Sequence, residues 1–136
     1  MKKGFTLIEL LVVIAIISVL SMIGLSSFQS AAKSGRDGKR KGDLSQIRAS
    51  LELYRSQQNA YPSGSINAVL TTLKSAGYMS DPLPADPKIG YSYVYTQGVG
   101  TYVLCAHLET VNAGNSSSST SIDGSGSLDY LCMTQP

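Results

Sequence analysis

The sequence predicts an α+β fold, in which one long N-terminal helix packs on a small antiparallel β-sheet head. Three observations lead to this class. An almost unbroken apolar run covers Leu10 to Leu25, and no proline occurs before Pro62, so nothing forces an earlier end to a helix. Short β-prone segments separated by turns follow towards the C-terminus. The 136 residues leave room for one domain.

The apolar part of the helix is long enough to cross a membrane. Residues 5–28 number about 24 and would extend roughly 36 Å as a helix. A secretory signal has a shorter apolar stretch, followed by a cleavage site of small residues. We therefore predict a membrane-spanning segment over residues 5–28. A signal anchor that is never processed is the alternative.

Glu9 is the residue that a plain anchor leaves unexplained. A carboxylate inside an apolar helix is costly if it faces lipid alone, so a partner must be named. Cleavage between Gly4 and Phe5 would create a free α-amino group at a similar depth. In a bundle of identical helices, Glu9 of one subunit could pair with the Phe5 ammonium of its neighbour. Such pairing favours one axial offset between the helices, because other offsets leave both charges unpaired.

The run KGFTLIE at residues 3–9, followed by the apolar stretch, resembles the class III signal of type IV pilins and type II secretion pseudopilins. The resemblance implies a pilin-like fold, a leader peptide at residues 1–4, cleavage after Gly4 by a prepilin peptidase, and methylation of Phe5. The glutamate at the fifth mature position of the family falls on Glu9. The implied partners are membrane lipid before assembly, an assembly platform with its ATPase, and further copies of the chain in a helical filament.

The charges that flank the span conflict with the orientation that the resemblance implies. Lys and Arg gather on the cytoplasmic side of a span. Only Lys2 and Lys3 precede it, whereas five basic residues follow: Lys33, Arg36, Lys39, Arg40 and Lys41. We nevertheless expect a single-pass protein of the inner or cytoplasmic membrane with its C-terminal domain outside, because the family has this orientation and a cysteine pair suits an oxidising compartment. After assembly, the filament would be extracellular or periplasmic.

Residues 29–59 continue the helix as an amphipathic segment. Apolar residues recur there at steps of three and four: Leu44, Ile47, Leu51 and Tyr54. This spacing predicts one face directed at a core. We expect the helix to end around Gln58-Asn59, because residues that precede a proline avoid the helical region.

A second line along this segment holds only small residues. They are Ala31, Gly35, Gly38, Gly42, Ser45 and Ala49. Small residues let helix backbones approach closely, so the line predicts packing against neighbouring helices in a filament core. The alternative is that the glycines merely loosen the helix, at about 1 kcal/mol each relative to Ala.

Residues 60–136 should form the globular head. We expect a short helix over Asn67–Ser75 that ends at Gly77, and a proline-rich connector over Asp81–Pro87. The strand candidates are Tyr91–Tyr95 and Thr101–Ala106, joined by a turn at Gln97–Gly100, and a last strand at Leu128–Cys132. The connector and the first strand also resemble pseudopilin-like heads.

The two cysteines, Cys105 and Cys132, predict one disulfide. It would close a loop of about 26 residues and stabilise the head by roughly 3 kcal/mol in the chain-entropy model. Two unpaired buried thiols are the alternative. Between the cysteines, the segment from Asn112 to Ser127 is rich in Ser, Gly, Asn and Thr, and we expect an exposed loop. Asn115-Ser116-Ser117 formally matches a glycosylation sequon.

No constellation of residues supports catalysis, and neither a cofactor nor a small-molecule substrate is expected. The one histidine, His107, stands near a cysteine that we expect to be oxidised. Asp81 and Asp86 flank prolines and are expected to be solvated turn residues. Zinc would need more ligands, and the segment Asp123–Asp129 offers calcium only two carboxylates, so no metal is expected.

Nucleic acid is not expected as a partner either. The net charge of +2 is small, and the patch Arg36–Lys41 is the chief candidate for such binding. The most direct expectation is a structural subunit of a type IV pilus-like filament, since the serine-rich disulfide loop and the missing acidic calcium-type terminus favour a pilus. A pseudopilin of a type II secretion system is the alternative. A membrane-anchored binding module that does not polymerise is a third class, disfavoured by Glu9 and the leader.

Overall fold

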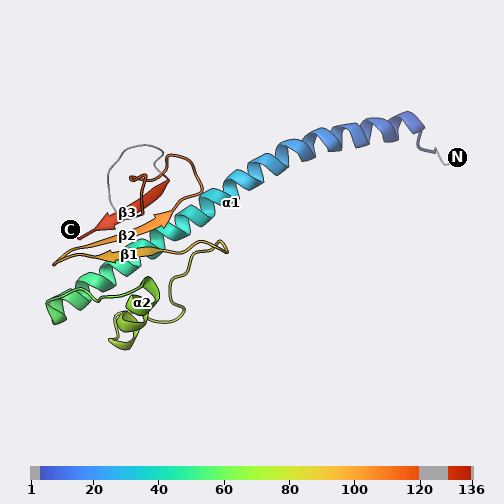
Figure 1. Ribbon diagram of the computed structural model, residues 1–136. Helices are drawn as coiled ribbons and strands as arrows, with labels where there is room; N and C mark the ends of the chain where they lie inside the picture. Colours follow the sequence, from blue (N-terminus) through green and yellow to red (C-terminus); the bar gives the residue numbers. More distant parts are fainter. Residues whose placement is uncertain (1–3, 120–128, 136) are drawn as a thin grey trace. The chain divides into compact units, whose positions relative to one another are not determined.

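The computed structural model describes residues 4–119 and 129–135, apart from the side chains at 23–26. In chain order the elements are α1 (Leu7–Gln58), α2 (Ile66–Ser75), β1 (Val94–Gln97), β2 (Tyr102–His107) and β3 (Tyr130–Thr134). The predicted α+β class, with a long N-terminal helix and a small antiparallel sheet, is confirmed (Figure 1). The chain divides into two compact units, residues 1–33 and 34–136, and each is described by itself.

The first unit contains the apolar part of α1. The helix is long and apolar enough to cross a membrane. Large apolar side chains in this part are exposed on all sides of the helix, as a span surrounded by lipid requires. Ser18 does not interrupt the apolar surface with a free hydroxyl, because its Oγ donates to the carbonyl of Ile14 at 2.7 Å.

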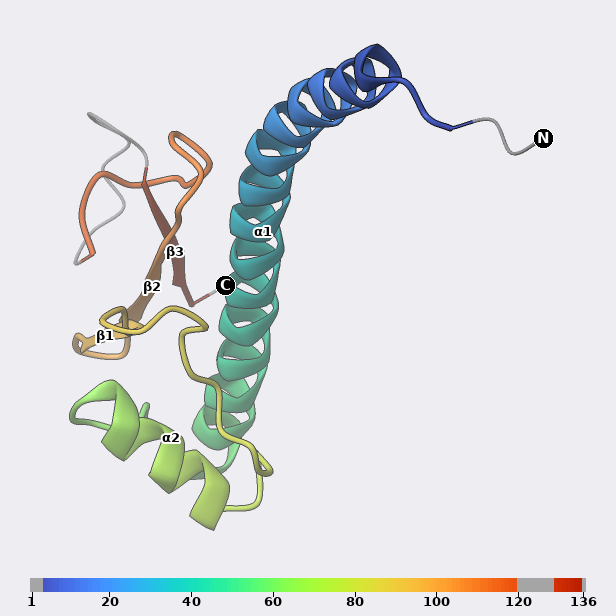
Figure 2. The same cartoon turned by 90° about the vertical axis from the view of Figure 1, so that its right-hand side faces the viewer.

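The second unit has a core between the later part of α1, α2 and the sheet. Leu44, Ile47 and Leu51 of α1 are fully buried, which confirms the predicted apolar face, and Tyr54 packs against them in part. The other elements contribute buried side chains to the same core, chiefly Val69, Leu70, Leu73, Tyr95, Tyr102 and Leu104. Figures 1 and 2 both show the sheet along this part of α1 and α2 near its C-terminal end.

The ends of both helices follow local sequence signals. α1 stops at Gln58, and the next residue, Asn59, has a φ of 56°, a conformation that asparagine tolerates better than most residues. In α2, Ser65 caps the first turn, and Gly77 at a φ of 81° closes the last one. There the N–H of Tyr78 donates to the carbonyl of Leu73, five positions earlier, at 2.9 Å. This is the hydrogen bond of a Schellman motif that spans more residues. Both predicted helix ends are confirmed.

The three strands form one antiparallel sheet in the order β1-β2-β3. The first strand differs from the prediction: β1 begins at Val94 rather than at Tyr91 and extends to Gln97. Tyr93 is instead buried in the core, and its hydroxyl donates to Asp43 of α1. The alternation of Tyr91–Tyr95 indicated a strand, but tertiary contacts of the tyrosines take priority over pairing with β2.

The last strand also differs from the prediction, because it ends at Thr134, two residues after the predicted end at Cys132. β3 runs from Tyr130 to Thr134, and Leu128 lies outside the described residues. Its register is fixed by the pair Cys105↔Cys132, which puts Thr134 opposite Val103. On its other side β3 is bridged by Ser116, whose backbone N–H and carbonyl both bond to Tyr130 at 3.0 Å. The loop therefore covers part of an edge that would otherwise be open to other chains.

Candidate functional site

The predicted cleavage site lies in non-helical chain ahead of α1. Gly4, Phe5 and Thr6 precede the first helical residue, Leu7. Gly4 is exposed, and 83% of the Phe5 side chain is exposed. Exposed chain outside regular structure is where proteases cut most readily. The arrangement leaves the bond between Gly4 and Phe5 open to a peptidase.

Thr6 and Glu9 form a capping box at the start of α1. The Thr6 Oγ1 accepts the backbone N–H of Glu9 at 3.3 Å. In return, Glu9 Oε2 accepts the backbone N–H of Thr6 at 2.9 Å and its hydroxyl at 2.8 Å. A helix start leaves N–H groups without partners inside the helix, and this reciprocal arrangement satisfies two donors there.

The capping box supplies a partner for Glu9 that sequence reasoning missed. Glu9 is the third residue of α1, in the first turn, where the helix dipole favours a negative charge. The sequence did contain the signal, because Thr-x-x-Glu ahead of an apolar run is typical of a helix N-terminus. The carboxylate is therefore hydrogen-bonded within its own chain, independently of any neighbouring subunit.

The line of small residues is exposed along its whole length. Its members are Ala31, Gly35, Gly38, Gly42, Ser45 and Ala49. A Cβ atom built at any of the three glycines would meet nothing within 4 Å. Packing within one subunit therefore does not require glycine at these positions.

Arg40 is the centre of a buried ion cluster in the second unit. Its side chain is 0% exposed. The guanidinium donates to both oxygens of Asp86 at 2.7 and 2.8 Å, to Asp37 at 2.7 Å and to Glu109 at 3.0 Å. These contacts join α1 to the proline-rich connector and to the segment that follows β2.

Glu109 and Asp37 extend the cluster. Besides its contact with Arg40, Glu109 accepts two hydrogen bonds from Arg36, at 2.7 and 2.8 Å, and forms an ion pair with Lys88 at 3.3 Å. Asp37 accepts the backbone N–H groups of Glu109 and Thr110, both at 2.9 Å. The cations of Arg36, Arg40 and Lys88 thus balance the carboxylates of Asp37, Asp86 and Glu109, which is what burial of so many charges requires.

The charges of the cluster shift the pKa values of its members in a consistent direction. Hydrogen bonds from Arg36, helped by those from Arg40 and Lys88, lower the pKa of Glu109 despite its desolvation. Burial by itself would raise the pKa of Asp86, but the hydrogen bonds from Arg40 and from the Lys88 N–H outweigh it and lower the pKa. All these carboxyls are therefore ionised at neutral pH.

One expectation from the sequence needs correction at this cluster, and a second feature of the sequence can now be described. Asp86 is not a solvated turn residue, because its side chain is 1% exposed and paired with Arg40; Asp81, at 65% exposed, fits the expectation. In the basic patch Arg36–Lys41, both arginines are engaged with carboxylates of their own subunit. They are not available as a pair of free cations for phosphate.

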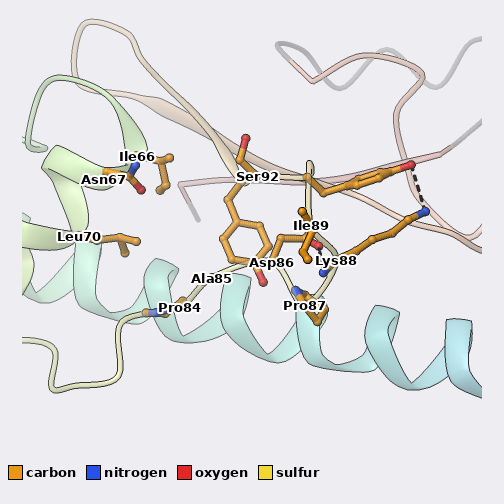
Figure 3. Close-up of a pocket in the computed structure, with 12 residues that line it drawn as sticks. Ile66, Asn67, Leu70, Pro84, Ala85, Asp86, Pro87, Lys88, Ile89 and Ser92 are labelled. Atoms are coloured by element: carbon orange, nitrogen blue, oxygen red, sulfur yellow. Dashed lines mark hydrogen bonds between the residues drawn. The ribbon is translucent and has the colours of Figure 1, made fainter.

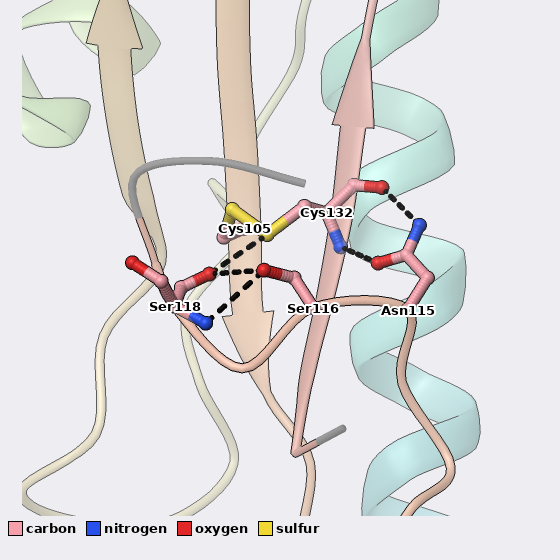
Figure 4. The surroundings of a disulfide bond; sticks show 5 residues. All are labelled: Cys105, Asn115, Ser116, Ser118 and Cys132. Carbon is pink, nitrogen blue, oxygen red and sulfur yellow. Dashed lines mark hydrogen bonds between the residues drawn. A yellow bond between two sulfur atoms is a disulfide. The ribbon is translucent and has the colours of Figure 1, made fainter. Parts of the chain in front are cut away.

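The disulfide between Cys105 and Cys132 joins β2 to β3 at directly opposed positions. The prediction is confirmed, and the alternative of free thiols is wrong. Figure 4 shows the adjoining loop against the same strand: Asn115 Nδ2 donates to the carbonyl of Cys132 at 2.8 Å, and Asn115 Oδ1 accepts its N–H at 2.7 Å. The amide of Asn115 therefore acts as a short extension of the β-ladder.

The sequence offered two candidate sites in this loop, a glycosylation sequon at Asn115 and a calcium site at Asp123–Asp129. The amide nitrogen of the sequon residue Asn115 is engaged with Cys132, so attachment of a glycan there would break that contact. Of the calcium candidate Asp123–Asp129, all but Asp129 lies outside the described residues. Among the residues that are described, no group of His, Cys, Asp and Glu side chains is placed to hold a metal ion.

A hollow of about 320 Å³ lies between α2 and the connector (Figure 3), and the described residues that line it offer no catalytic constellation. Its charged side chains are engaged: Asp86 with Arg40, and Lys88 with Tyr91 at 3.3 Å. His107 lies between the rings of Tyr91 and Tyr130, with centroids 5.1 and 5.0 Å away, and the nearby cysteine is oxidised.

Comparison with known proteins identifies the N-terminal segment. Residues 1–25 match the prokaryotic N-terminal methylation motif. No curated protein and no solved structure matches the chain significantly. With Gly4 and Phe5 ahead of α1, Glu9 in its first turn and a membrane-length apolar helix behind them, the chain begins with the class III signal of type IV pilins and pseudopilins.

Proposed function

We propose that the chain is the precursor of a structural subunit of a type IV pilus-like filament. Prepilin peptidase cleaves it between Gly4 and Phe5 and methylates the new N-terminus. The observation that carries the proposal is the methylation motif at residues 1–25, joined to an apolar helix and a separate disulfide-bonded head. A subunit of this kind acts by assembly, and the described residues offer no arrangement for chemistry of their own.

Before assembly, the apolar part of α1 holds the subunit in the membrane with the head outside. A platform protein and its ATPase then extract it into a homo-oligomeric filament. The exposed apolar side chains between Phe5 and Met22, together with Phe28, support this step, because they can be buried against equivalent helices as well as against lipid. A reporter fused after Gln135 tests the orientation: activity only in the oxidising compartment is expected, and activity in the cytoplasm contradicts it.

Within the filament, we propose that Glu9 pairs with the methylated Phe5 ammonium of a neighbouring subunit. The carboxylate has already been brought to the N-terminal turn by the capping box, four positions from Phe5. A charge pair in a medium of low dielectric acts strongly on register, since an offset helix leaves both charges unpaired.

The exposed line of small residues is proposed as a second assembly contact. Because the three glycines meet nothing within their own subunit, a partner helix can approach the backbone closely there. Gly38→Leu would fill that space and is expected to reduce filament yield at least tenfold while the head remains folded. Gln57→Leu, at an exposed position of α1 off the line, is the control. Equal yields for the two variants would reject the contact.

A pseudopilin of a type II secretion system remains the second candidate, since the methylation motif is common to both classes. The serine-rich loop held by Cys105–Cys132 favours a surface pilus, because such a loop suits display outside the cell. The intact mass of the protein in filaments sheared from native cells, compared with the membrane fraction, distinguishes them.

A species that starts at methylated Phe5 and is abundant in the sheared material is the expected result. The same species confined to membranes would favour the pseudopilin or a minor subunit. An unprocessed chain starting at Met1 in every fraction would overturn the filament function and leave an anchored binding module.

A further inference from the structure

The part of α1 at residues 34–42 is held to the head differently from the part that follows. All nine residues are described, and none of them buries an apolar side chain; their buried side chains are Asp37 and Arg40. From Leu44 onwards the contacts are apolar, with Leu44, Ile47 and Leu51 fully buried. One helix is therefore attached by ion pairs over its first section and by an apolar core over the next.

The same nine residues are poor at forming a helix by themselves. Gly35, Gly38 and Gly42 are three of them, and glycine is the weakest helix former other than proline. Since a Cβ at each position would meet nothing within 4 Å, the glycines are not imposed by packing within the subunit. The helical conformation here depends on the ion cluster on the opposite face of the helix.

We propose that residues 34–42 are a releasable segment, which opens as a unit while the core from Leu44 onwards stays folded. Opening requires the contacts of Arg36, Asp37 and Arg40 with Asp86 and Glu109 to break. Water can solvate the separated charges, whereas it cannot replace the apolar contacts of Leu44, Ile47 and Leu51. The boundary between the two kinds of contact is thus the boundary of the opening unit.

Opening of the segment would lengthen the chain locally, because an extended chain is longer than a helix of the same residues. Nine helical residues extend roughly 14 Å, and the same residues fully extended reach about 30 Å. In chain order the segment stands between the apolar part of α1 and the core of the head. Its opening would add roughly 15 Å of chain there without unfolding the head.

Hydrogen exchange of the full-length monomer in detergent, measured by mass spectrometry at pH 7, tests the proposal without any requirement for filaments. Amides of residues 36–43 are expected to exchange at least tenfold faster than those of residues 46–54. Gly38→Ala should slow exchange in the segment about fivefold, and alanine at all three glycines on the order of 100-fold, as helix propensity implies.

Gln57→Ala, an exposed substitution in α1 beyond the core contacts, is the matched control and should leave the segment unchanged. Arg36→Gln removes two hydrogen bonds to Glu109 and should speed exchange in the segment, which should still exchange faster than residues 46–54. Equal rates in the two sections of wild-type α1, or no response to the three alanines, would overturn the proposal. An Arg36→Gln variant in which the segment exchanges no faster than in the wild type would do the same.

Discussion

The guanidinium of Arg40 forms a two-pronged ion pair with the carboxylate of Asp86, 46 positions further along the chain. Nε donates to Oδ2 at 2.8 Å and Nη2 to Oδ1 at 2.7 Å, with the two side chains 0% and 1% exposed. This parallel geometry is the strongest that an arginine makes with a carboxylate. It fixes the proline-rich connector to α1, and the connector in turn leads into the sheet.

Removing one partner of this pair should be strongly destabilising. Asp86→Asn leaves a buried guanidinium short of one negative charge, so we expect the free energy of unfolding to fall by about 3–5 kcal/mol. Denaturant titration of the protein in detergent measures it. Lys74→Ala, which breaks the exposed pair with Asp81, should change stability by less than about 1 kcal/mol. Similar losses of unfolding free energy in both variants would show that the buried pair of Arg40 and Asp86 stabilises the head no more than an exposed pair does.

The ion cluster should also make the head sensitive to acid. The folded-state pKa values of Asp37, Asp86 and Glu109 are lowered, so the unfolded chain binds protons more readily and falling pH favours unfolding. The stabilisation is complete above about pH 5 and is lost as the pH falls through 4 and below. Thermal unfolding between pH 7 and pH 2 checks this. A melting temperature that stays constant down to pH 3 would contradict the role of the cluster.

Alkaline conditions should weaken the core by another route. Burial raises the pKa of Tyr95 to about 12, and its hydroxyl donates to the carbonyl of Pro62 at 2.8 Å. Because the unfolded tyrosine ionises near pH 10, its contribution is present below that pH and is lost as the pH rises towards 12. Tyr95→Phe should therefore flatten the decline in stability above pH 10, as followed by circular dichroism, while leaving the acid limb intact.

Loss of the disulfide should destabilise the head without changing its topology. Cys105 and Cys132 are separated by 27 positions, so the chain-entropy model gives roughly 3–4 kcal/mol for the closed loop. The double variant Cys105→Ser, Cys132→Ser should melt at a lower temperature, and reductant should no longer affect it. Asn115 and Ser116 still pair with β3, so the near-native circular dichroism spectrum should survive below the melting point.

Glu9→Gln should separate processing from assembly. The amide oxygen can still accept from Thr6, so the helix start and the cleavage site should remain intact. The charge that would pair with a neighbouring Phe5 ammonium is gone, and we expect processed protein in membranes with at least a tenfold loss from sheared filaments. Normal filament yield would reject the ion pair as an assembly contact, and a failure of cleavage would show that the carboxylate acts earlier.

Local patterns in the sequence were sufficient for the helices. The apolar run, the stripe of Leu44, Ile47 and Leu51, and the terminal residues Asn59 and Gly77 each act over a few neighbouring positions. The capping box of Thr6 and Glu9 carries an equally local signal, the spacing Thr-x-x-Glu, which was absent from the sequence prediction. The strands were located less well, since a strand exists only opposite a partner.

The sequence by itself determined where α1 ends, that its first part suits a membrane, and that the head carries one cysteine pair. Only the tertiary structure decided which charges are buried. Arg36, Arg40 and Asp86 look in sequence like ordinary surface residues, and each has a partner that lies 46 to 73 positions away. Periodicity reports on contacts within a few residues, whereas an ion pair depends on which distant segments the fold brings together.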